Sequence, residues 1–225
     1  YPYWAPDGSS IVWTSLRDGV GNLYQKAANG AGPDTVLLTS EYPKFAIDWS
    51  ADKRFILYRE IVPQTKADLW VLSLEDGKYW PWLKTSFNEE VGRFSPDGKW
   101  IAYQTNDSGR PEIYLQAFAP GAPASGGRWR LSTNGGRNPQ WRRGGGELYY
   151  ISLDNKLMAV EAPLGAEVKY GTPRELFALS DIGANPSASY AVTRDGQRFL
   201  FVANAEETSP TPFTVVLNWM TEVKK

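Results

Sequence analysis

The chain has 225 residues, 24 of them basic and 25 acidic, so its net charge is −1 and no basic excess would draw it to a nucleic acid. Cysteine and histidine are both absent, which excludes disulfides, thiolate metal sites and a histidine-based catalytic triad. Aromatic residues make up 14% of the chain, and its 21 glycines and 16 prolines supply many turns, a mixture that favours β-strands.

From the N-terminus onward, one short motif recurs five times along the chain. A large apolar residue is followed, after two residues, by Asp-Gly or a related pair, and these anchor residues are Trp4, Trp49, Phe94, Trp141 and Val192. The anchors lie about 45–50 residues apart, a spacing typical of β-propellers, in which each repeat forms one four-stranded blade.

Three further strands are predicted in each repeat after the strand that ends at the anchor. The second strand of each repeat is predicted at residues 11–13, 55–58, 100–103, 148–151 and 199–202. The third is predicted at 22–25, 68–72, 112–115, 156–160 and 213–217, and the fourth at 35–38, 79–83, 128–131 and 174–177. Pro81 in a fourth strand suits an outer edge, because proline cannot donate a hydrogen bond to a neighbouring strand.

These elements predict one all-β domain, a β-propeller with five recognisable four-stranded blades, of which the last lacks its outer strand. The repeats span residues 1–40, 41–86, 87–133, 134–180 and 181–225. Since the missing strand would come from residues before Tyr1, we expect the natural protein to continue N-terminally as part of a larger ring. The alternative is a five-bladed ring with a three-stranded last blade. The unpaired edge could also allow self-association with a second copy.

Four aspartates occupy the same repeat position, three residues after an anchor: Asp7, Asp52, Asp97 and Asp195. A ring of carboxylates could bind Ca²⁺, but equivalent turns of different blades lie far apart around a propeller. We therefore expect each aspartate to have a structural role, capping its own hairpin turn. We expect neither a metal nor a cofactor.

The residue before each anchor belongs to the innermost strand of its blade, which lines the central channel. These residues are Tyr3, Asp48, Arg93, Gln140 and Ala191. Because three of them are strongly polar, we predict that Asp48, Arg93 and Gln140 face the channel or its mouth, with Asp48 and Arg93 close enough to interact. The alternative is that they only satisfy one another and channel water.

The loops between the second and third strands, and between one blade and the next, carry further candidates for ligand binding. They are Arg17, Asp18, Glu89, Asp107, Arg137 and Asn138. Such residue types suit a peptide or a small polar ligand. The alternative is that they are solvated loop tips.

Several strings resemble known propellers. Ser15–Gly19, Asn22–Tyr24 and Phe94–Lys99 resemble the WD-like repeats of TolB-type propellers, and this resemblance covers the whole chain. Strings at 65–72, 108–112, 156–161 and 215–219 resemble the C-terminal propeller of bacterial membrane-anchored serine/threonine kinases, of the sort abundant in Acidobacteria. Gly144 departs from the pattern, since aspartate is expected there.

The resemblance implies a sensory or scaffolding domain with a protein, peptide or small polar ligand as its partner, in the periplasm or elsewhere outside the cytoplasm. No motif for phosphoryl transfer is present, and no run of about 18 apolar residues predicts membrane insertion. We predict an interaction or ligand-sensing module that is not an enzyme. Two alternatives stay open: a glycosidase-type hydrolase, for which Asp18, Asp48 and Glu89 are the only candidate carboxylates, and a propeller that gates a separate peptidase domain.

Overall fold

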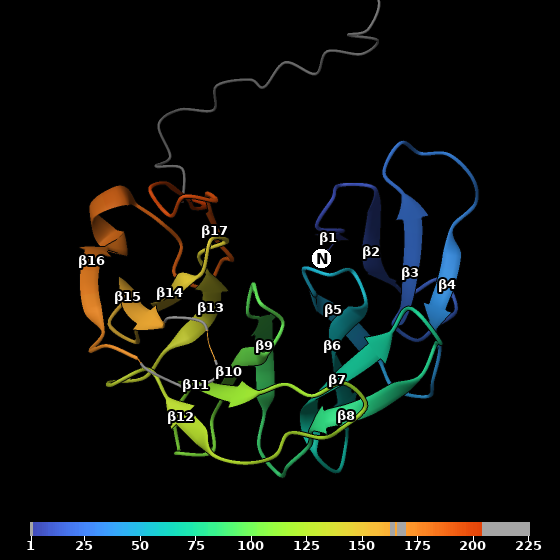
Figure 1. Cartoon of the computed structure of the whole chain (residues 1–225), viewed down its shortest axis with the longest axis horizontal. Helices are drawn as coiled ribbons and strands as arrows, with labels where there is room; N and C mark the ends of the chain where they lie inside the picture. Colours follow the sequence, from blue (N-terminus) through green and yellow to red (C-terminus); the bar gives the residue numbers. More distant parts are fainter. Residues whose placement is uncertain (1, 163–164, 166–169, 204–225) are drawn as a thin grey trace, which may run out of the picture.

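The computed structural model describes residues 2–162, 165 and 170–203 of the chain. Four four-stranded antiparallel sheets follow one another along the chain, and a two-stranded sheet comes last. The sheets are arranged in an arc around a common centre, with β1, β5, β9, β13 and β17 innermost (Figure 1). This arrangement confirms the all-β propeller fold.

The blades are numbered in chain order. Blade 1 comprises β1 (Tyr3–Trp4), β2 (Ser10–Ser15), β3 (Asn22–Ala27) and β4 (Thr35–Leu38). Blade 2 comprises β5 (Lys44–Trp49), β6 (Phe55–Val62), β7 (Lys66–Ser73) and β8 (Tyr79–Leu83). Blade 3 comprises β9 (Glu89–Phe94), β10 (Trp100–Thr105), β11 (Glu112–Ala117) and β12 (Arg128–Arg130).

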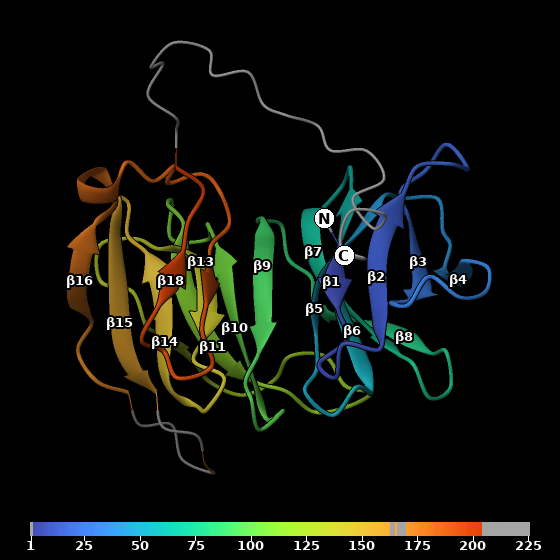
Figure 2. The ribbon, with the colours of Figure 1, turned by 90° about the horizontal axis from the view of Figure 1, so that it is seen from above.

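Blade 4 comprises β13 (Arg137–Trp141), β14 (Gly146–Ile151), β15 (Lys156–Ala162) and β16 (Arg174–Ala178), followed by the 3-10 turn η1 (Leu179–Ile182). The described part of blade 5 comprises β17 (Ala191–Val192) and β18 (Phe199–Leu200). The strands of one blade run side by side, roughly along the axis of the arc (Figure 2). The strand predicted at 213–217 lies outside the described residues.

The hydrophobic core is divided into layers between neighbouring blades. Strand β6 shows why: Ile56 and Tyr58 pack towards blade 1, whereas Leu57 packs with Phe94 and Ile101 of blade 3. Successive side chains of a strand point to opposite faces, so an uninterrupted apolar run serves a sheet that is covered on both faces. The runs that follow the anchors therefore build the blade-to-blade packing.

The turn between the first and second strand of each blade is called here an inner turn; the five span residues 5–8, 50–53, 95–98, 142–145 and 193–196. In blade 3, Asp97 Oδ1 accepts hydrogen bonds from the Ser95 hydroxyl at 2.6 Å and the Lys99 N–H at 3.2 Å. The turn closes with a bond from the Gly98 N–H to the Ser95 carbonyl, and Gly98 has a φ of 69°, which suits glycine.

The other inner turns repeat this geometry. Asp7, Asp52 and Asp195 each accept a backbone N–H two residues further on, at 3.0–3.1 Å. The blade 4 turn has no aspartate, yet the Gly145 N–H donates to the Arg142 carbonyl at 2.8 Å. The backbone bond alone is therefore enough to form this turn, and Gly144 does not change its type.

Two strands are shorter than the sequence predicts. Strand β12 ends at Arg130, one residue early, and β18 ends at Leu200, because β17 offers it only two paired positions. Pro81 pairs opposite Trp70 in the outer strand β8, as expected of a proline at a sheet edge. Strands β1 and β17 lie on either side of the opening in the arc (Figure 1), and how the ring closes stays a prediction.

Candidate functional site

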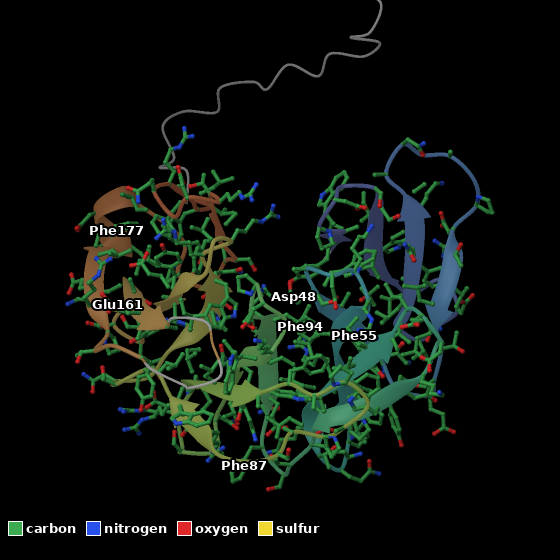
Figure 3. All side chains as sticks on the ribbon, viewed as in Figure 1. Asp48, Phe55, Phe87, Phe94, Glu161 and Phe177 are labelled. Carbon is green, nitrogen blue, oxygen red and sulfur yellow. The ribbon has the colours of Figure 1, made fainter. Side chains whose placement is uncertain are left out.

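A central pocket of about 610 Å³ lies where the innermost strands of all five blades converge. The five residues that precede the anchors line it: Tyr3, Asp48, Arg93, Gln140 and Ala191. So do the inner-turn residues two positions after each anchor: Pro6, Ala51, Pro96, Arg143 and Arg194. The pocket therefore lies at the end of the channel where the inner turns are. Asp48 and Phe94 mark its inner wall in Figure 3.

Arg93 joins the innermost strands of four blades. Its guanidinium donates to the carbonyl of Ile47 in β5, to the Gly92 carbonyl at 2.9 Å and to Gln140 Oε1 in β13 at 3.2 Å. It also lies over the ring of Tyr3 in β1, 5.4 Å from the ring centre, with a long contact of 3.4 Å to the hydroxyl. Only 7% of Arg93 is exposed, so its main role is to connect the innermost strands within the channel. Arg93 with these contacts is called here the clasp.

Asp48 contributes a carboxylate to the pocket wall. Its Oδ2 accepts the backbone N–H of Phe94 at 2.7 Å, which links blade 2 to blade 3. Burial raises the pKa of the Asp48 carboxyl to about 6, although the positive charge of Arg93 and the bond from Phe94 act in the opposite direction. The positive charge of Arg93 therefore acts on Asp48 through space. The hydrogen bonds that the guanidinium donates to described residues go to other groups.

Tyr190 is a pocket residue that the sequence reasoning missed. Only 5% of it is exposed, its ring stacks on Phe201, and its hydroxyl has no hydrogen-bond partner among the described residues. Burial raises its pKa well above the usual range, so the hydroxyl stays protonated. Tyr190 stands two residues before its anchor, where the other repeats have Pro2, Ile47, Gly92 and Pro139. An aromatic residue at a position where the other four repeats have none was the sequence feature that could have indicated Tyr190.

The remaining candidates from the sequence do not line this pocket. Arg17 donates to Asp34 at 2.7 Å and lies 4.3 Å from the ring centre of Tyr24, whose hydroxyl donates to Asp18. These contacts use the charges of both loop candidates within blade 1. Arg17 and Asp18 are thus tied to their own blade.

The candidates in blades 3 and 4 likewise contact residues that lie outside the pocket. Asp107 pairs with Arg128, and Arg137 donates to Asn155 at 2.7 Å. The backbone N–H of Asn138 lies 3.4 Å from Gln104 Oε1. Asp107 lies in the loop after β10, and Arg137 and Asn138 begin β13. Both places are at the strand ends opposite the inner turns, so the pocket lies at the other end of the channel from them.

Glu89 is 1% exposed and lies away from the pocket, in the packing between blades 2 and 3. Its Oε1 accepts the Thr85 hydroxyl at 2.5 Å, whereas its Oε2 has no partner among the described residues. Burial, together with the charge of Asp68, raises the pKa of Glu89 to about 7.

The three carboxylates considered for hydrolysis are therefore not brought together. Of Asp18, Asp48 and Glu89, only Asp48 lines the pocket, and within the described ranges no other acidic residue does. Two-carboxylate hydrolysis needs a pair flanking one bond, which this pocket lacks. In the same part of the chain, no three acidic side chains gather as metal ligands would.

Known structures share this architecture. A TolB-type protein of Agrobacterium tumefaciens superposes with a TM-score of 0.60 at 19% identity, over 77% of this chain and 64% of that one. The TolB of Acinetobacter baumannii gives 0.69 at 17% identity, over 90% and 48%. An oligogalacturonate lyase in complex with manganese gives 0.53 at 13% identity, over 92% and 71%. No family model and no curated protein matches the chain.

The fold defines the class: the chain is a β-propeller, and its architecture is similar to that of TolB proteins. At these identities the likeness concerns the fold, and enzymes occur among the more distant neighbours. The chain spans less than two thirds of either TolB chain. No helix in the described residues is long and apolar enough to cross a membrane.

Proposed function

We propose that this propeller is a non-catalytic binding module that recognises a segment of a partner protein, or a similarly sized polar ligand, in its central pocket. One observation carries the proposal: all five blades contribute to a single pocket with aromatic walls and one carboxylate. Trp4, Trp49, Trp141 and Tyr190 supply large, rigid contact surfaces, which are common at the centres of binding sites.

The cellular setting belongs to the same proposal. We propose that the chain is the sensor or scaffold part of a larger bacterial signalling protein, located outside the cytoplasm. The basis is the resemblance of several of its sequence strings to kinase-associated propellers. The net charge of −1 supports a protein or small-molecule partner over a nucleic acid.

The test fills the pocket with a bulky side chain. Ala191 lines the pocket and is exposed, so Ala191→Trp should occupy the site without disturbing the core. Peptides selected from a phage-displayed library on the wild-type chain should lose about tenfold or more in affinity for Ala191→Trp, measured by calorimetry. Ala31→Trp, on an exposed loop of blade 1, is the matched control and should bind within about twofold. Equal binding to both variants would place the site elsewhere.

A further inference from the structure

Two arginines stand at the rim of the central pocket, on the inner turns of blades 4 and 5. Arg143 and Arg194 are exposed and both line the pocket. Neither forms an ion pair or a side-chain hydrogen bond with any residue that the structure describes. Within the described part of the chain their guanidinium donors are therefore not engaged, in contrast to those of Arg93.

A second, shallower cavity of about 710 Å³ adjoins the rim and shares Arg194. It is also lined by Arg142, Asp195 and Arg198. Arg142 lies 3.6 Å from Glu147, and Asp195 accepts hydrogen bonds within its own turn, so both charges are engaged locally. Arg198 is exposed and has no ion pair within the described part of the chain. Arg143, Arg194 and Arg198 together are called here the arginine strip.

The opposite side of the rim has a different character. There Asp7 and Lys53, on the inner turns of blades 1 and 2, form an ion pair at 2.9 Å, and Asp52 on the same turn as Lys53 adds a negative charge. Trp4 lines the pocket on this side and is 58% exposed, and Pro6 lies beside it. One side of the mouth thus exposes Trp4 and has no excess of positive charge, whereas the other side is positively charged.

We propose that the arginine strip binds carboxylates of an acidic segment of a partner protein, while an apolar side chain of the same segment enters the central pocket. This inference rests on the proposed function and adds the chemical class of the partner. Arginine suits the role because its planar fork donates two parallel hydrogen bonds to one carboxylate. The strip is short, and the chain as a whole has no positive field, which favours a short acidic segment over a long polyanion.

The experiment compares two labelled peptides by fluorescence anisotropy at low salt: repeats of Glu-Trp-Gly, and the same repeats with Gln in place of Glu. The complete chain should bind the Glu peptide about tenfold more tightly than the Gln peptide, because only carboxylates form charge-assisted bonds with the strip. The double variant Arg194→Gln/Arg198→Gln should remove most of this difference.

The matched control is Lys66→Gln/Arg130→Gln, which also removes two positive charges. Both residues are exposed, line neither of the two cavities, and form no ion pair in the described part of the chain. The control should bind the Glu peptide within about twofold of wild type. Thermal melting of all variants verifies that they remain folded.

Two outcomes separate this inference from the proposed function. If both peptides bind equally well and Ala191→Trp abolishes their binding, the pocket is a binding site but the inference about charge is wrong. If the double variant binds the Glu peptide as tightly as wild type, the inference is likewise overturned. A single-stranded DNA oligomer that binds more tightly than the Glu peptide, with the same dependence on Arg194 and Arg198, would assign the strip to polyanions and overturn the choice of partner.

Discussion

Glu89 shows how a single buried carboxyl can make the stability of this propeller depend on pH. Its Oε2 lacks a hydrogen-bond partner among the described residues, and the carboxylate of Asp68 is close enough to disfavour a second negative charge. Burial also raises the pKa of Asp68. Ionisation of both Glu89 and Asp68 at the same time is therefore disfavoured.

The pH range of this effect follows from the pKa of Glu89, which is about 7 in the folded chain against a reference value of 4.5. Between these values the folded form keeps a proton that the unfolded form has released. The free energy of unfolding is therefore highest below pH 4.5 with respect to this group and falls as the pH rises towards 7. We expect the fall to be about 1–3 kcal/mol.

Glu89→Gln should remove this loss, because the amide is neutral at every pH and its oxygen can still accept the Thr85 hydroxyl. Urea unfolding at pH 5 and pH 8 measures it: the variant should lose about 1–3 kcal/mol less than wild type between the two values. Glu41→Gln, at an exposed position, is the control and should follow wild type. If Glu89→Gln and Glu41→Gln show the same pH dependence, Glu89 does not carry the effect.

At the scale of the elements, blades 2 and 3 pack closely at Gly92, where β9 lacks a side chain. A Cβ on Gly92 would lie 2.5 Å from Leu57 Cδ2 and 3.5 Å from Leu69 Cδ1. Leu57 is fully buried in the layer between the blades, so it has little room to move away. Glycine is needed here for a close approach of strands, and its backbone angles do not require it.

Gly92→Ala should therefore destabilise the chain by about 1–3 kcal/mol through overpacking. The control is Gly144→Ala, where a Cβ would meet nothing within 4 Å, and where we expect a change of about 0.5 kcal/mol or less. Denaturant unfolding followed by tryptophan fluorescence measures both. A destabilisation as small as that of Gly144→Ala would mean that Leu57 can repack.

For the molecule as a whole, Arg93 connects the blades through non-covalent contacts. A propeller has no continuous hydrogen-bonded sheet around its axis, so its innermost strands are joined mainly by side chains. Arg93 contacts the innermost strands of blades 1, 2 and 4 from blade 3, and the Trp141 indole donates back to the Arg93 carbonyl at 3.3 Å. The clasp also fixes the shape of the central pocket.

Arg93→Met keeps the apolar stem but removes the guanidinium, leaving the Ile47 carbonyl and Gln140 without their donor. We expect a loss of about 2–4 kcal/mol in the free energy of unfolding, and faster amide exchange in β5 and β13. Arg93→Lys should recover only part of the loss, because one ammonium cannot reach all of these strands. Arg130→Met, on an exposed outer strand, should change stability by about 0.5 kcal/mol or less. Equal effects of Arg93→Met and Arg130→Met would contradict the clasp.

The local features of this propeller could be predicted from the sequence because they depend on neighbours in the chain. The anchors and the apolar runs after them indicated the strands of the four complete blades to within a few residues. The residues before the anchors, among them Asp48, Arg93 and Gln140, were assigned to the channel because strand alternation and repeat position decide which way a side chain points.

The location of the pocket was decided by the tertiary structure. Arg17, Asp107 and Arg137 look like binding residues in a sequence, yet folding pairs each with a polar side chain of its own blade. Tyr190, Arg143 and Arg194 became pocket residues only because five separate repeats converge on one axis. A sequence determines which residues occupy equivalent places, whereas the distances between those places, and the charges that remain unpaired, exist only once the blades have packed.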